Sequence, residues 1–111
     1  MPATLESRST DAIFKALADP TRREILSLLR GGRYSVGEIA SNFHVSRPAI
    51  SKHLRLLRSA GLIKDTPEGT ARMCELNAGP LRRIDSWLRR YETFWDSSLL
   101  KLKAHVESKT K

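Results

Sequence analysis

The chain has 111 residues, a formal net charge of +8 and a sequence pI of about 10.3. This length fits one domain with one core. No apolar run approaches the roughly 20 residues that cross a bilayer, and the amino terminus lacks the apolar run of a secretory signal. We therefore expect a cytoplasmic protein. The single cysteine, Cys74, excludes an intramolecular disulfide and a cysteine-rich metal site.

Positive charge is concentrated in the middle of the chain. Residues 39–64 contain no acidic side chain but include Arg47, Lys52, Arg55, Arg58 and Lys64. A basic balance favours a polyanionic partner, which can be DNA, RNA or an anionic membrane surface. Basic side chains that lack acidic neighbours in one block are better explained by an external anion than by internal ion pairs.

The amino-terminal part predicts a flexible arm and a short helix. Residues 1–9 are expected to form the arm, and a helix over residues 11–18 follows, capped by Ser9 or Thr10. Its buried face is predicted to consist of Ile13, Phe14 and Leu17, which recur at helical spacing.

The next two helices have clear start signals. Asp19-Pro20 predicts a helix over residues 20–30, because Asp is a good N-cap and Pro suits the first helical position. Ser35 and Glu38 have the spacing of a capping box and predict a helix over residues 36–43.

The following segments predict a helix, a hairpin and a long final helix. Ser46 is expected to cap a helix over residues 47–59 that Gly61 ends. Extended runs over residues 62–66 and 70–76 flank turn residues 67–69 and predict a β-hairpin. Asn77 is expected to cap a helix over residues 79–106, followed by a flexible tail over 107–111. The predicted fold is mainly α with a small β-hairpin, a dimeric winged helix-turn-helix that occupies residues 10–106.

Two short helices joined by a tight turn, the second of them basic, match the helix-turn-helix plan. In the second helix, Ile50, Leu54 and Leu57 form a core stripe. The amino-terminal residues of such a helix reach base edges, so the base-contact candidates are Arg47, Pro48, Ser51 and Lys52. Phosphate contacts, which position the protein, are expected from Ser46, Arg55 and Arg58. The alternative is an amphipathic helix with a solvated basic face.

The hairpin has the place of a wing. Lys64, Thr70 and Arg72 can reach phosphates or the adjacent minor groove, whereas Glu68 near the tip argues against strong contact there. A wing that serves only as a lid on the core is the alternative.

The chain resembles the ArsR family of bacterial winged-helix repressors. The matching segments, residues 14–26, 36–40, 45–57 and 60–63, occur in order. The resemblance implies a homodimer, operator binding, and repression that an unnamed signal releases. It places DNA contact on Arg47, Ser51, Lys52 and His53.

The chain departs from the metal-sensing members of this family. The helix before the recognition helix carries no Cys-x-Cys pair, and the last helix offers only Asp96, His105 and Glu107 near its end. Asp96 and His105 are too far apart in sequence for one compact chelate, which leaves a site shared between two chains as the alternative. The sequence therefore resembles the non-metal-sensing branch, and we expect no metal and no cofactor.

The last helix predicts the dimer contact. Its apolar positions step by three and four residues, which is the spacing of a seam for another helix, and both tryptophans lie on it. The predicted interface consists of Phe14, Leu81, Ile84, Trp87, Leu88, Tyr91, Phe94, Trp95 and Leu102. The alternatives are an intramolecular core helix and a ligand pocket between the aromatic rings. The twofold axis would set half-sites about 34–36 Å apart, one turn of DNA.

Other functions find less support in the residues. Cys74 is better explained as a small apolar filler than as a redox sensor. No catalytic triad, phosphate-binding glycine loop or pair of catalytic carboxylates can be assembled, so we expect no enzyme. The competing function is a protein-interaction module that uses the aromatic helix, with the basic face incidental. The expected partners are double-stranded DNA and a second copy of the chain, and no membrane.

Overall fold

The computed structural model describes residues 5–109, and within them it leaves out the side chains of residues 5–7, 96–100, 104 and 107–109. The chain divides into two compact units, Met1–Leu81 and Arg82–Lys111. The first unit therefore holds the helices and strands of the predicted head, and the second holds the carboxy-terminal helices. The predicted winged helix-turn-helix domain over residues 10–106 includes residues of both units. Among the described residues, none of the helices is long and apolar enough to span a bilayer.

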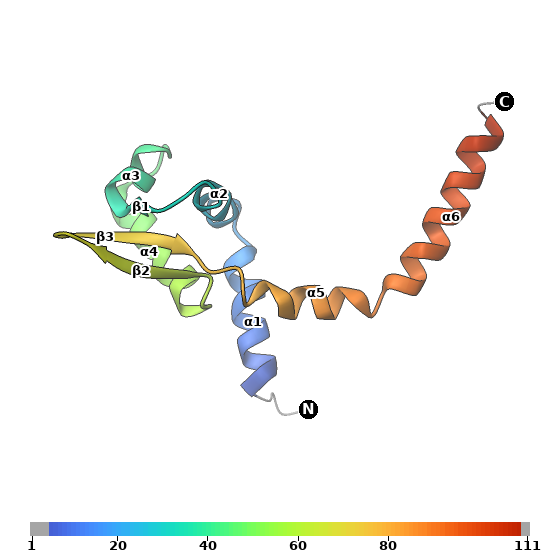
Figure 1. Ribbon diagram of the computed structural model, residues 1–111, viewed down its shortest axis with the longest axis horizontal. Helices are drawn as coiled ribbons and strands as arrows, with labels where there is room; N and C mark the ends of the chain where they lie inside the picture. Colours follow the sequence, from blue (N-terminus) through green and yellow to red (C-terminus); the bar gives the residue numbers. More distant parts are fainter. Residues whose placement is uncertain (1–4, 110–111) are drawn as a thin grey trace. The chain divides into compact units, whose positions relative to one another are not determined.

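The first unit is mainly helical with a small sheet (Figure 1). The helices are α1 Leu5–Leu17, α2 Pro20–Leu29, α3 Val36–Ser41 and α4 Arg47–Ser59. The strands are β1 Tyr34–Ser35, β2 Ile63–Glu68 and β3 Ala71–Leu76, and the antiparallel sheet has the order β1-β3-β2. The predicted fold class is confirmed, with β1 as a third strand that the sequence did not predict.

The first helix begins earlier than expected. α1 starts at Leu5, so the prediction of an arm through residue 9 was wrong for residues 5–9, and Ser9 and Thr10 lie inside the helix rather than at its cap. Residues 5–17 contain neither glycine nor proline, and nothing interrupts the backbone hydrogen bonds. Residues 1–4 of the predicted arm lie outside the described residues.

The core of the first unit draws on every helix and on the hairpin. Ile13 and Ala16 of α1, the apolar side of α2 and Ile39 of α3 are buried. The predicted stripe of α4 is confirmed, since Ile50, Leu54 and Leu57 are at most 1% exposed. Phe14, which the spacing placed in the core, is 38% exposed, and Ala16 takes the buried position instead. Burial of each large side chain contributes about 1.5–3 kcal/mol of stability, so the stripe holds α4 against the core.

The hairpin turn lies slightly later than predicted. β2 continues through Pro67 and Glu68, and Glu68 pairs with Ala71, so the loop consists of Gly69 and Thr70. Gly69 has φ +63°, which suits the first position of a two-residue hairpin turn and which other residues rarely adopt. In Figure 1 the hairpin tip projects beyond α4.

The second unit begins within α5 Leu81–Arg89 and continues with α6 Glu92–Lys109. The prediction of one continuous helix over residues 79–106 was therefore wrong. The amides of Arg90 and Tyr91 donate to carbonyls three residues earlier, Trp87 and Leu88, which tightens and ends the helix there. The predicted tail over 107–111 begins inside α6, which reaches Lys109.

Asn77 does not cap a helix. Its side-chain amide donates to the Gly61 carbonyl at 2.9 Å, and its backbone amide donates to the Leu62 carbonyl at 2.8 Å. Asn77 therefore ties the end of β3 to the end of α4 and the start of β2.

Candidate nucleic-acid interface

The two helices of the predicted helix-turn-helix are fixed at both starts by side-chain caps. At α3, Ser35 Oγ accepts from the Glu38 amide at 3.1 Å, and Glu38 Oε1 accepts from the Ser35 amide at 2.9 Å. This confirms the capping box, and the hydrogen bond from the Ser35 amide holds the pKa of Glu38 below its usual value. Residues 42–46 form the turn between the helices.

The recognition helix α4 has well-defined ends. Ser46 Oγ accepts from the Ala49 amide at 3.2 Å and begins the helix, as predicted. At its end Gly61 has φ +77°, and the Leu62 and Gly61 amides donate to the Leu57 and Arg58 carbonyls. This pair of bonds is a Schellman motif, which only a residue tolerant of positive φ completes easily.

The side of α4 away from its buried stripe carries a row of exposed cations. The side chains of Arg47, Lys52 and Arg55 are exposed and make no hydrogen bond or ion pair with any residue that the structure describes. The Arg47 guanidinium lies beside α3, where a Cβ added to Gly37 would be 3.9 Å from Nη2. We call Arg47, Ser51, Lys52 and Arg55 the reading edge. Its cations are free to meet an external anion.

Two further predicted contacts on α4 are engaged within the chain. Arg58 Nη2 donates to Asp65 Oδ1 of β2 at 3.1 Å. The His53 side chain is 19% exposed, and its Nδ1 lies 3.2 Å from Arg22 Nη1 of α2. Sequence reasoning missed both partners, because Asp65 and Arg22 approach α4 only through tertiary packing.

The residues predicted to make the wing contacts lie on different parts of the hairpin. Arg72 lies on the same face as Asp65 and Cys74, the face that Arg58 of α4 touches. Lys64 lies on the opposite face, directly across from Glu75. Thr70 is exposed in the turn. The three residues therefore do not form one patch, and Arg72 and Thr70 are better placed than Lys64 to contact a duplex that α4 also contacts.

Cys74 is buried beneath this hairpin. It is 1% exposed, and its thiol donates to Asp65 Oδ1 at 3.7 Å. Burial raises the pKa of the Cys74 thiol, and the nearby Asp65 carboxylate raises it further. Because the thiolate is the reactive form, this environment suits the predicted apolar filler and not a redox sensor.

The carboxy-terminal helices carry several large apolar side chains that are exposed. α5 has no buried residue. Trp87, Tyr91, Phe94, Trp95 and Leu102 are between 37% and 68% exposed. The rings of Trp87 and Tyr91 meet edge to face, with centroids 5.3 Å apart. Exposed apolar patches of this kind mark interaction surfaces.

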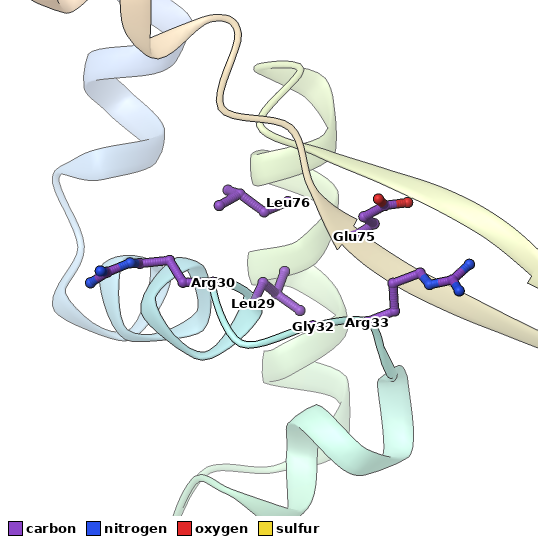
Figure 2. Close-up of a pocket in the computed structure, with 6 residues that line it drawn as sticks. All are labelled: Leu29, Arg30, Gly32, Arg33, Glu75 and Leu76. Carbon is purple, nitrogen blue, oxygen red and sulfur yellow. The ribbon is translucent and has the colours of Figure 1, made fainter.

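The first unit contains a depression of about 380 Å³ (Figure 2). It is lined by Leu29, Arg30, Gly32, Arg33, Glu75 and Leu76. The Arg30 and Arg33 side chains point to opposite sides in Figure 2, so they do not converge on one ligand group. Among the described side chains, no group of three His, Cys, Asp or Glu residues is placed to hold a metal ion. The Asp96 and Glu107 side chains lie outside the described residues.

Comparison with known proteins identifies relatives along most of the chain. The family model for the bacterial regulatory protein, arsR family, matches residues 19–65, from the α2 cap to the start of the wing. The transcriptional repressor SdpR of Bacillus subtilis (strain 168) is 40% identical over 87 residues, which are 78% of this chain and 97% of SdpR.

Solved structures agree with this match. The crystal structure of an ArsR family transcriptional regulator has a TM-score of 0.73 and 33% identity, and the alignment covers 87% of this chain and 98% of that one. The homodimeric winged helix-turn-helix DNA-binding domain of Mb0332 from Mycobacterium bovis, a possible ArsR-family regulator, has a TM-score of 0.60 and 28% identity. That alignment covers 83% of this chain and 82% of that domain.

Proposed function

The chain belongs to the ArsR family of bacterial regulatory proteins, and from this membership we propose that it is a homodimeric repressor that binds a palindromic operator. It is a DNA-binding regulator of transcription with a winged helix-turn-helix. In our proposal α4 enters the major groove, where Arg47, Ser51 and Lys52 meet base edges. Ser46, Arg55 and the wing residues Thr70 and Arg72 bind phosphates.

The reading edge is the observation that carries this proposal. α4 is fixed at both ends and buried along one stripe, while the cations on its other side have no partner among the described residues. A helix-turn-helix presents this part of its second helix to base edges. A basic face that only contacts solvent would not require a helix with both ends fixed and one side buried.

The repressor role and the dimer rest on different observations. SdpR, which this chain covers almost entirely, is a transcriptional repressor. The Mb0332 domain is homodimeric, and here the carboxy-terminal helices expose an aromatic surface. We propose that a second copy covers it, and that the first helix contributes Phe14. Repression then follows from occlusion of a promoter by the bound dimer in the cytoplasm.

The alternative function, a protein-interaction module with an incidental basic face, has no counterpart among these relatives. They are regulators of transcription, and we propose accordingly that the chain catalyses no reaction.

The direct test is a titration of fluorescent DNA from upstream of the gene against scrambled DNA of equal length. We expect tighter binding to the upstream DNA and a steep fall in affinity with salt, because neutralised phosphates release counterions. Equal affinity for both DNAs, or an affinity independent of salt, would contradict the proposal.

Two substitutions at Ser46 distinguish its role in the stability of α4 from its proposed contact with DNA. Ser46→Ala removes the cap and should lower the free energy of unfolding by about 1 kcal/mol. Ser46→Asp keeps the cap, because Asp is an equally good N-cap, but it places a carboxylate near the phosphates. We expect Ser46→Asp to unfold at the wild-type urea concentration and to bind DNA about tenfold more weakly. Wild-type DNA affinity in Ser46→Asp would contradict the phosphate contact of Ser46.

Arg55 and Arg58 can be compared on α4, because the Arg58 side chain donates to Asp65 and the Arg55 side chain has no partner among the described residues. If Arg55 binds a phosphate in each half-site, Arg55→Ala should reduce the slope of log affinity against log salt by about two. Arg58→Ala should change this slope less and should lower stability by no more than about 1 kcal/mol, as for a surface ion pair. A larger change of slope for Arg58→Ala would reverse this assignment.

A further inference from the structure

His53 of the recognition helix approaches polar side chains at the corner between α1 and α2. At that corner the guanidinium of Arg22 makes three hydrogen bonds. Its Nε donates to the Ala16 carbonyl at 2.7 Å and its Nη2 to the Lys15 carbonyl at 3.0 Å, both at the end of α1. Its Nη1 lies 3.2 Å from His53 Nδ1 in α4. One side chain of α2 therefore joins the end of α1 to the middle of α4.

The chemistry of this contact defines the state of the imidazole. A guanidinium has only donors, so His53 Nδ1 must be the acceptor, and the proton of the neutral ring must lie on Nε2. Asp19 Oδ2 is farther from the same nitrogen, at 3.9 Å, and that carboxylate already caps α2 by accepting from the Arg22 amide at 3.1 Å. The shorter contact of His53 Nδ1 is therefore the one with Arg22.

The position of His53 makes this contact important for reading DNA. It follows Lys52 of the reading edge and precedes Leu54 of the buried stripe. Apolar contacts along that stripe are non-directional, whereas a hydrogen bond has a preferred direction. A rotation of α4 by about 15° would move a side-chain tip roughly 6 Å from the axis by about 1.5 Å, enough to break a base contact.

We propose that Arg22 is a positioning residue for DNA recognition, which holds His53 as an Nδ1 acceptor and so fixes the rotation of α4. This inference rests on the proposed function. It also reassigns His53, which the family resemblance placed among the DNA contacts, to an anchor between α4 and the α1–α2 corner. Arg22 contacts no DNA in this account and acts only through His53.

Arg23 provides a matched control. Its Nη1 donates to the Leu17 carbonyl at 2.8 Å, so Arg23 also binds the end of α1, and no described contact joins it to α4. Arg22→Gln and Arg23→Gln each remove one charge and loosen the same helix end. Only Arg22→Gln releases His53. Asn at position 53 places an acceptor near the position that His53 Nδ1 occupies, so it can keep the contact with Arg22. Gln places its acceptor near the position of Nε2 and cannot.

The first measurement uses the free protein and needs no DNA. Nitrogen chemical shifts of His53 should show an unprotonated Nδ1 and a protonated Nε2 in the wild type and in Arg23→Gln. In Arg22→Gln this single tautomer should be lost, and α4 amides should exchange with solvent faster. A protonated Nδ1 in the wild type, or equal α4 exchange in the two variants, would overturn the inference.

The second measurement compares affinities for the upstream DNA. Arg22→Gln and His53→Gln should each bind about tenfold more weakly, because a rotated α4 loses a base contact worth about 1–3 kcal/mol. Arg23→Gln and His53→Asn should stay within about twofold of the wild type. If Arg22→Gln bound the upstream DNA as tightly as the wild type, this inference would be overturned and the proposed function would stand. A wild-type protein that does not prefer the upstream DNA would instead overturn the proposed function.

Discussion

Arg47→Ala is expected to weaken binding to the operator by roughly 30-fold or more, while binding to scrambled DNA changes much less. A bidentate arginine–guanine contact discriminates by about 1–3 kcal/mol, and a dimer loses it in both half-sites. Arg47 is exposed at the first turn of α4 and has no partner among the described residues, so its loss should leave the fold intact. Titration of both DNAs at one salt concentration measures the change in preference.

The control for Arg47 is Arg8→Ala, which removes an exposed arginine from α1. It should change the affinity for both DNAs slightly and equally. If Arg47→Ala weakened binding to operator and scrambled DNA by the same factor, Arg47 would be a phosphate contact and the reading edge would begin farther along α4.

Phe94→Asp is expected to convert the dimer to a monomer. Phe94 is 68% exposed in the single chain, and a twofold interface buries it in both copies. Loss of an aromatic anchor costs about 2 kcal/mol or more each time, so dimerisation should weaken about a thousandfold or more. Sedimentation equilibrium over a range of protein concentrations measures the dissociation constant.

Thr93→Asp is the control for Phe94, because it places the same carboxylate one residue earlier in α6 at an exposed position. This variant should remain dimeric and bind DNA normally. A Phe94→Asp protein that sediments as a dimer would mean that the two copies meet elsewhere.

Elements with side-chain caps or terminal glycines could be predicted from the sequence. Asp19, Ser35 and Ser46 each cap the helix that follows, and Gly61 ends α4, as local chemistry requires. Ends without such residues were placed less well. α1 begins before its predicted cap, and the break at residues 90–91 has neither glycine nor proline to mark it.

In the candidate site too, local sequence predicts some features and tertiary packing decides the others. The core stripe of α4 and the exposure of Arg47, Lys52 and Arg55 follow from helical periodicity alone. Periodicity does not say which exposed cation meets an acid or a histidine from another element. The Arg58–Asp65 and Arg22–His53 contacts join residues 7 and 31 positions apart, and the second depends on how three helices pack.

In the proposed complex, two copies of α4 read two half-sites on one face of DNA. Hydroxyl-radical footprinting of the upstream DNA locates both contacts. Our account predicts two protected patches with centres about 10–10.5 base pairs apart, and loss of this pattern in Phe94→Asp. One protected patch for the wild-type protein, or protection without a fixed position, would contradict it.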